Sequence, residues 1–180
     1  MPNDARALIE NRYHIAYAAQ PDISFSEFGT RHVGEKLSAT LGYRRADREP
    51  LFLEAYIDEP IETALASAIG RPFARHDIIE IGNLASDNAM AMIDLWADTA
   101  NDLGGSAEIA VAVLTTPLRS MFRRLGLRLH EIAAARPERL GACAGQWGSY
   151  YQLDPVICAG FISEGQDRLA RIVRHRSRAA

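Results

Sequence analysis

Cysteine is scarce in this sequence, since only Cys143 and Cys158 occur among 180 residues. Neither belongs to a Cys-x-x-Cys motif or a Cys/His cluster, and the five histidines are scattered, so the sequence predicts no metal site. Unpaired cysteines are typical of a reducing compartment. We expect both thiols to be buried and inert, because free cysteine usually packs like a small apolar residue.

Long apolar runs are also missing. No stretch approaches the roughly 18 apolar residues of a membrane span, and the opening Met-Pro-Asn-Asp does not begin an apolar signal segment. Charge is nearly balanced, with 20 Lys and Arg against 23 Asp and Glu and a net charge of −3. We therefore expect a cytoplasmic protein without a membrane span and without a nucleic-acid partner.

Three common catalytic signatures are absent as well. The sequence contains no Gly-x-Ser-x-Gly, no His-Glu-x-x-His and no Gly-x-x-x-x-Gly-Lys. This excludes the usual sequence signs of serine hydrolases, zinc peptidases and P-loop nucleotide-binding proteins. It does not exclude catalysis by another arrangement of residues.

Hydrophobic residues make up 48% of the sequence, which is enough to bury a sizeable core, and no linker is visible. Periodicity predicts helices over 5–19, 60–70, 87–103, 117–125 and 166–176, and strands over 36–44, 51–57, 77–84, 108–114 and 155–162. This order predicts a single α/β (α+β) domain over 1–165, with a central mixed sheet flanked by helices. A basic C-terminal helix or tail follows over 166–180.

Glu80 is the most unusual residue of the chain, because it lies inside the apolar run Ile-Ile-Glu-Ile-Gly-Asn-Leu-Ala-Ser of residues 78–86. A carboxylate among apolar side chains needs either a partner or a chemical role. Strand alternation places Asn83 on the face opposite Glu80, unless a bulge brings Asn83 back. The structural alternative is that Glu80 pairs with a buried arginine, such as Arg12 or Arg75, and only stabilises the fold.

A second run, residues 51–62, also mixes acidic with apolar side chains. If it is extended, Glu54 and Tyr56 share a face. Together with Glu62 they form a cluster able to bind the ammonium group of an amine or amino acid. A purely structural hydrogen-bonded network is the alternative interpretation.

Four ordered motifs carry a family resemblance over roughly residues 5–165. They are Leu-Phe-Leu-Glu-x-Tyr-x-Asp-x-Pro-Ile-Glu at 51–62, Glu-x-Gly-Asn-Leu-Ala-Ser at 80–86, Phe-x-Arg-Leu-Gly-Leu at 122–127 and Trp-Gly-x-Tyr-Tyr at 147–151. With these motifs the sequence resembles the thermostable hemolysin family. That family is named for haemolysis, but its members resemble GNAT acyltransferases and, among them, acyl-homoserine-lactone synthases.

The resemblance implies a GNAT-like domain whose fourth and fifth strands, 77–84 and 108–114, splay apart and hold an acyl thioester in the gap. GNAT enzymes usually bind the coenzyme A pyrophosphate through an Arg/Gln-x-x-Gly-x-Gly/Ala loop. The corresponding stretch here, Asp-Asn-Ala-Met-Ala at 87–91, has no glycine or arginine and places a carboxylate at the helix N-terminus. This departure counts against ordinary acetyl-CoA use.

The resemblance to acyl-homoserine-lactone synthases suggests an acyl carrier protein as the donor. Such carriers are acidic, and a basic group is available to dock one. It consists of Arg119, Arg123, Arg124 and Arg128. A solvated basic helix face is the alternative. We expect no tightly bound cofactor, and either acyl-CoA or acyl-phosphopantetheine as the co-substrate.

A GNAT-like transfer needs a base for the attacking amine and a donor for the thioester oxygen. Glu80 is the candidate base, and the candidate catalytic residues besides it are Asn83, Glu54 and Tyr56. The candidate substrate-binding residues are Glu62, Arg12, Arg75, Trp147, Tyr150 and Tyr151. The last three are expected to line an acyl pocket, with core packing as the alternative.

The sequence therefore predicts an acyltransferase that moves an acyl group from a thioester to a small amine or amino-acid acceptor, in specialised metabolism or signalling. One alternative is a membrane-active hemolysin that acts through the basic C-terminal helix, whose apolar residues are Leu169, Ile172 and Val173. Another is a catalytically inactive GNAT-like binding module.

Overall fold

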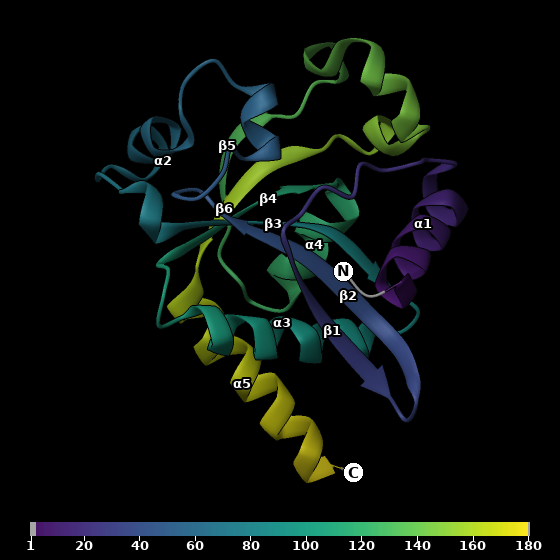
Figure 1. Cartoon of the computed structure of the whole chain (residues 1–180). Helices are drawn as coiled ribbons and strands as arrows, with labels where there is room; N and C mark the ends of the chain where they lie inside the picture. The colour runs from purple at the N-terminus through teal and green to yellow at the C-terminus, as the bar shows by residue number, and fades with distance from the viewer. Residues whose placement is uncertain (1–2, 180) are drawn as a thin grey trace.

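The computed structural model describes residues 3–179, which form a six-stranded mixed sheet with helices on both faces (Figure 1). The order across the sheet is β1-β2-β3-β4-β6-β5. Only the neighbours β3 and β4 are parallel. The strands are β1 (Glu27–Val33), β2 (Lys36–Arg45), β3 (Ile78–Ser86), β4 (Ile109–Leu114), β5 (His130–Ala134) and β6 (Val156–Phe161). The helices are α1 (Asn3–Tyr17), α2 (Ile61–Ile69), α3 (Ala89–Leu103), α4 (Thr116–Arg124) and α5 (Ile162–Ala179).

The predicted α/β domain with a central mixed sheet is confirmed. Every predicted helix overlaps an observed one, whereas β1 and β5 were not predicted. Both lie at the two ends of the sheet, where a strand pairs on one side only, and most of their residues are partly exposed. Such edge strands lack the regular apolar alternation that marks a buried strand.

The strand predicted over 51–57 is wrong, because Phe52–Tyr56 forms a 3-10 helix, η1. Its backbone donors bind carboxylates instead of a neighbouring strand. The N–H of Leu51 donates to Glu54, and the N–H groups of Phe52 and Leu53 donate to Glu80. These bonds satisfy the peptide groups that a strand would have paired in a sheet. Glu54 and Tyr56 consequently do not share a strand face.

Strand β3 has two irregularities that position the candidate site. Its pairing with β4 ends at Glu80 opposite Val111, so the last residues of the two strands are splayed. Its pairing with β2 shifts register, because Gly42 lies opposite Gly82 while Thr40 lies opposite Ala85. The extra residue on β3 is a β-bulge.

The two faces of the sheet are covered differently. Helices α3 and α5 lie below the sheet in Figure 1 and pack against each other, with α4 joined to them through the stacked rings of Trp96 and Phe122, 4.4 Å apart. Helix α2 and η1 cover one part of the other face, around Leu53, Ile61 and Ile78. Helix α1 covers the remaining part with two further 3-10 segments, η3 (Pro137–Trp147) and η4 (Tyr150–Leu153).

Helix α5 begins at Ile162, before the predicted start of the C-terminal helix. Its Leu169 is buried against the α3 side chains, and Ile172 and Val173 pack on the same cluster. The apolar side of the helix therefore packs inside the protein, which removes the support for the hemolysin alternative. No helix within residues 3–179 is long and apolar enough to cross a membrane.

The two cysteines differ in exposure. Cys158 on β6 is buried, as expected, and burial raises the pKa of its thiol to about 12. Cys143 is exposed, so the prediction of a buried thiol is wrong there. It lies in η3, a segment for which the sequence predicted neither a helix nor a strand.

Candidate functional site

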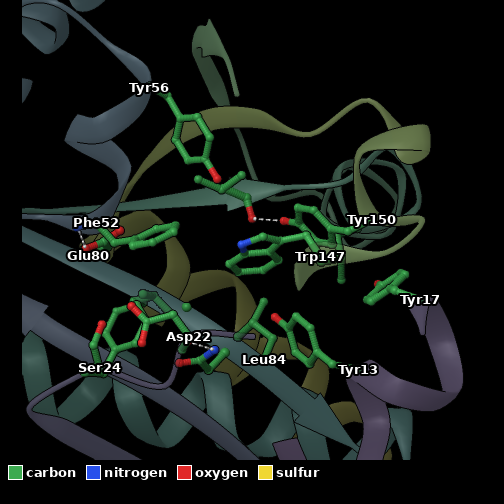
Figure 2. A pocket seen from close by; sticks show the side chains of 16 residues that line it. Tyr13, Tyr17, Asp22, Ser24, Phe52, Tyr56, Glu80, Leu84, Trp147 and Tyr150 are labelled. Carbon is green, nitrogen blue, oxygen red and sulfur yellow. Dashed lines mark hydrogen bonds between the residues drawn. The ribbon is translucent and has the colours of Figure 1, made fainter. Parts of the chain in front are cut away.

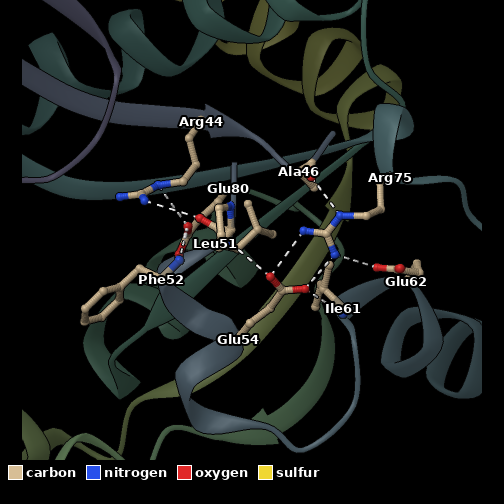
Figure 3. Close-up of polar contacts among 10 residues, drawn as sticks. Arg44, Ala46, Leu51, Phe52, Glu54, Ile61, Glu62, Arg75 and Glu80 are labelled. Atoms are coloured by element: carbon tan, nitrogen blue, oxygen red, sulfur yellow. Dashed lines mark hydrogen bonds and ion pairs between the residues drawn. The ribbon is translucent and has the colours of Figure 1, made fainter. Parts of the chain in front are cut away.

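Glu80 lies on β3 at the point where the β3–β4 pairing ends, and only 2% of it is exposed. Its carboxylate accepts hydrogen bonds from the backbone N–H groups of Phe52 and Leu53, at 2.8 and 2.9 Å (Figure 3). Its cationic partner is Arg44, whose Nε lies 3.3 Å from Oε2. The alternative prediction that Glu80 pairs with a buried arginine is therefore correct, but the arginine is Arg44 and not Arg12 or Arg75.

Arg44 is the counter-ion because it lies directly opposite Glu80 in the antiparallel register of β2 and β3. It is 6% exposed, and its guanidinium also stacks on the Phe25 ring, 4.3 Å from the ring centroid. The sequence carried a signal for this pair, since 36–44 and 77–84 were both predicted as strands. The pairing register, however, could not be deduced from one sequence.

Burial raises the pKa of Glu80 to about 7, although Arg44 and the two backbone donors lower it. Removing the carboxylate from water outweighs these favourable contacts. A carboxyl group with a pKa near neutrality can both accept and release a proton under physiological conditions. A pKa near neutrality is what a general base requires, so Glu80 remains the candidate for that role.

Asn83 is brought to the same face as Glu80 by the bulge, and it adopts a left-handed conformation with φ of 47°. Its Nδ2 donates to the carbonyl oxygen of Asp22 at 3.1 Å. Its Oδ1 is buried and has no hydrogen-bond donor within the described part of the chain. The side chain thus presents one unsatisfied acceptor beside Glu80.

A cavity borders Glu80 and Asn83 and encloses about 670 Å³, its open mouth included (Figure 2). We call it the aromatic cavity. Its lining residues are Tyr13, Tyr17, Asp22, Ser24, Phe25, Phe52, Tyr56, Glu80, Ile81, Gly82, Asn83, Leu84, Val113, Leu118, Trp147 and Tyr150. Figure 2 shows Trp147 between Glu80 on one side and Tyr17 on the other.

The predicted aromatic residues divide between this cavity and its surroundings. Trp147 and Tyr150 line it, while Tyr151 does not and instead shares a hydrogen bond of 2.6 Å with Tyr56. Tyr13 and Tyr17 were missed, although their spacing of four residues in a predicted helix places them on one face. The loop residues Asp22, Ser24 and Phe25 were missed because that loop has no periodic pattern.

A second cavity lies on the other face of the sheet, beneath α3, α4 and α5, and encloses about 840 Å³ with its mouth. We call it the apolar cavity, because its walls are almost entirely aliphatic and aromatic. Representative lining residues are Trp96, Ala112, Phe122, Cys158, Phe161 and Leu169. Ile81 and Leu84 of β3 line both cavities, so the two meet where β3 and β4 splay apart.

The acidic cluster predicted around Glu54 is an internal network (Figure 3). Arg75 donates to Glu54 at 2.7 Å and to Glu62 at 2.8 Å, and Glu54 also accepts from the backbone N–H of Ile61. Burial alone would raise the pKa of Glu54, but these hydrogen bonds hold it below its usual value. Of the cluster, only Tyr56 borders the aromatic cavity, and Arg12 does not border it either. For Glu54 and Glu62, the structure therefore agrees with the alternative prediction of a structural hydrogen-bonded network.

The four arginines predicted to dock a carrier protein have different surroundings. Arg119 is 6% exposed, and it binds the carbonyl oxygens of Leu114 and Asp154, so it cannot present its charge to a partner. Arg123 is exposed but forms an ion pair of 2.5 Å with Glu131. Arg124 and Arg128 are exposed, and Arg128 lines the apolar cavity.

The N-terminus of α3, where GNAT enzymes usually bind pyrophosphate, is capped by its own residues. Asn88 accepts a hydrogen bond from the N–H of Met90 at 2.8 Å. Asp87 forms an ion pair of 2.6 Å with Lys36. Within residues 3–179, no group of three or more His, Cys, Asp or Glu side chains is arranged to hold a metal ion.

Comparison with known proteins gives one family match for this sequence and several solved structures with a similar fold. Residues 2–166 match the family described as thermostable hemolysin, as the motifs predicted. A comparison with curated proteins gives no match.

Solved structures share the fold at low sequence identity. TofI in an apo form is 15% identical, with a TM-score of 0.61 over 94% of this chain and 91% of that one. FeeM, an N-acyl amino acid synthase from uncultured soil microbes, is 16% identical, with a TM-score of 0.59 over 92% and 93%. BjaI, a CoA-dependent acyl-homoserine lactone synthase solved with SAM and isopentyl-CoA, is 13% identical, with a TM-score of 0.61 over 95% and 82%. The expected similarity to acyl-homoserine lactone synthases in fold is confirmed.

Proposed function

This chain belongs to the thermostable hemolysin family, and from that premise we propose that it is an acyltransferase that moves an acyl group from a thioester to a small amine. One observation carries the proposal. Glu80, a buried carboxylate with a pKa near 7, lines the aromatic cavity next to Ile81, which lines both cavities. A perturbed carboxylate at a convergent cavity is the arrangement expected of a catalytic acid or base.

The acyl chain occupies the apolar cavity in this proposal. The walls of that cavity would cover the methylene groups of a chain, each of which contributes about 0.8 kcal/mol when buried. The thioester then lies in the gap beyond Glu80 and Val111, where β3 and β4 no longer pair. Ile81 and Leu84 flank this passage from both cavities.

The amine enters from the aromatic cavity. Glu80 takes a proton from the ammonium group, and the neutral nitrogen attacks the thioester carbonyl carbon. The C–N bond forms and the C–S bond breaks, so the products are an amide, a thiol and one released proton. Backbone N–H groups of the bulged segment after Glu80, which have no β4 partner, are candidates to donate to the carbonyl oxygen.

We further propose a carrier protein as the acyl donor, in keeping with the expected cytoplasmic location. The capped α3 N-terminus and the Asp87 carboxylate leave little favourable potential for a pyrophosphate. Arg124 and Arg128 supply an exposed positive charge near the apolar cavity, suited to an acidic carrier. The docking group that we propose therefore consists of these two arginines and not of the four that the sequence predicted.

The test is intact-mass detection of acylated product with purified protein, acyl-CoA or acyl-carrier-protein donors of several chain lengths, and a mixed amine library. We expect Glu80→Gln to reduce product formation by about 100-fold or more, because general base catalysis is lost. Glu108→Gln is the matched control, since Glu108 is an exposed residue paired with Arg71. Absence of product from every donor, or a Glu80→Gln variant as active as the control, would reject the proposal.

Chain-length preference tests the apolar cavity separately. Ala112→Leu adds bulk inside that cavity, so we expect it to shift the preferred acyl chain to a shorter one. Ala133→Leu adds the same bulk to a partly buried β5 residue outside the cavity. It should leave the preference unchanged.

A further inference from the structure

We infer that the acceptor is an amine that carries no carboxylate, recognised in the aromatic cavity through its ammonium group and an apolar or aromatic body. This inference rests on the proposed function and narrows it, since the sequence left open whether the acceptor is an amine or an amino acid. It follows from the charges, the unsatisfied acceptor and the rings that surround the cavity.

The cavity wall contains negative charge and no positive charge. Two of its lining residues, Asp22 and Glu80, are acidic, and none of the sixteen is Arg, Lys or His. Arg44 is the cation next to Glu80, but it is already paired with that carboxylate and covered by the ring of Phe25. Arg12 is close enough to lower the pKa of the Tyr17 hydroxyl, against the larger effect of burial, but it does not border the cavity.

Among the residues that line the cavity, Asn83 has a buried side-chain atom without a hydrogen-bond partner among the described residues, and this atom is an acceptor. Because the Asn83 Nδ2 donates to the Asp22 carbonyl, its amide orientation is fixed and Oδ1 remains the free atom. This residue is 5% exposed and borders the cavity beside Glu80. An ammonium group can donate to Asn83 Oδ1 and to a carboxylate at once. A carboxylate has no proton to donate to either group.

The rings complete a surface that favours cations. Seven of the fourteen aromatic residues of the chain line this one cavity. Tyr13, Tyr17 and Trp147 all pack around Tyr150, with ring centroids 5.2–6.5 Å from it. Burial raises the pKa of the hydroxyls of Tyr13 and Tyr150, so both rings stay neutral. Neutral aromatic faces attract cations and bind flat apolar groups by stacking.

An α-amino acid would bring its carboxylate into the same surroundings. The amino and carboxyl groups are separated by a single carbon, so binding the ammonium beside Glu80 places the carboxylate near two acids, with no cation in the cavity wall and with the neighbouring Arg44 already paired with Glu80. Unpaired burial of a charge and repulsion between like charges both weaken binding. We expect an amine to bind at least about tenfold more tightly than the matching amino acid.

The test is calorimetric titration of the full chain, without an acyl donor, with pairs that differ only in the carboxylate. Suitable pairs are tyramine with tyrosine and phenethylamine with phenylalanine. Tyrosine methyl ester is the third ligand, because it restores the size of the carboxylate but not its charge. We expect the ester to bind like tyramine. Equal or tighter binding of the free amino acids, or no binding of any of these ligands, would overturn the inference.

Charge reversal at the cavity mouth provides an independent check. Asp22 is exposed and lines the cavity, so Asp22→Lys should reduce the preference for tyramine over tyrosine by about tenfold or more. Asp102→Lys makes the same change at an exposed position at the end of α3, on the other face of the sheet. It should leave the preference unaltered. A ratio that moves equally in both variants would contradict a local charge effect.

Parallel transfer assays separate this inference from the proposed function. Acylation of tyrosine as readily as tyramine would overturn the inference and uphold the acyltransferase. Tight, carboxylate-sensitive binding of amines with no acyl product from any donor would uphold the inference about recognition and reject the transfer reaction.

Discussion

Replacing the Glu80 carboxyl group by an amide should change how the stability of the folded protein depends on pH. Burial raises the folded-state pKa of Glu80 from 4.5 to about 7, so the folded state binds this proton more tightly than the unfolded state does. The stabilising contribution of Glu80 is therefore fully present below about pH 4.5 and is lost as the pH rises through 7. Each pKa unit corresponds to about 1.4 kcal/mol, which gives a loss of about 3 kcal/mol across this window.

Glu80→Gln cannot titrate, so its free energy of unfolding lacks this loss. The variant will differ from the wild type even at low pH, where Glu80 is protonated, because an amide NH2 group replaces the carboxyl O–H beside the N–H groups of Phe52 and Leu53. The informative quantity is the change in that difference with pH. We expect the variant to gain about 3 kcal/mol relative to the wild type between pH 4.5 and pH 8.

Urea unfolding at half-unit pH intervals measures this change directly, provided that the unfolding slope is the same for both proteins. Glu138→Gln is the control, because Glu138 is exposed in η3 and its variant should run parallel to the wild type. Parallel curves for Glu80→Gln and the wild type would show that folding does not raise the pKa of Glu80. The argument for a base poised near neutrality would then be refuted.

Three further changes test the packing around the site. Gly82→Ala places a methyl group too close to ring atoms of Phe25, so we expect the free energy of unfolding, measured by heat or urea, to fall by about 1–3 kcal/mol. An unchanged stability would mean that the loop carrying Phe25 does not pack against Gly82. Arg75→Met leaves Glu54 without its cation in a partly exposed network, so a loss of about 1–2 kcal/mol is expected in the same assay, and no loss would show that the network is not stabilising. A thiol reagent at pH 8 should label the folded protein only at exposed Cys143, because Cys158 is buried with a pKa of about 12, and equal labelling of both would contradict this packing.

Much of the fold was predictable because its central elements repeat apolar residues at a regular period. Strands β3 and β4 and helix α3 are buried between layers, so their patterns are strong. The segment 51–57 shows the limit of such patterns. Its alternation is that of a strand, but the segment forms a 3-10 helix in which the carboxylates of its own Glu54 and of the distant Glu80 bind its backbone N–H groups. A tertiary contact overrides the local preference there.

The sequence was sufficient to predict the central residues Glu80 and Asn83 of the candidate site, but not the residues that surround them. Glu80 was identifiable because an acid inside an apolar strand is unusual, and the possible bulge at Asn83 followed from the same run. The counter-ion Arg44 depends on a strand register, and the contribution of Phe25 depends on where a loop without periodicity is seated. Neither is encoded within a short window of sequence. The aromatic residues came from α1 and from η3 and η4, which are distant in the chain.

The meeting of the two cavities at Ile81 and Leu84 has a kinetic meaning. If donor and acceptor approach from opposite faces of the sheet, neither blocks the route of the other, and both can be bound before any bond breaks. Double-reciprocal plots should then intersect, as in a sequential mechanism with random order of addition, and no acylated enzyme should accumulate. The sheet also separates the two binding sites. Mutations in the apolar cavity can therefore change the preferred acyl chain without changing which amine binds in the aromatic cavity.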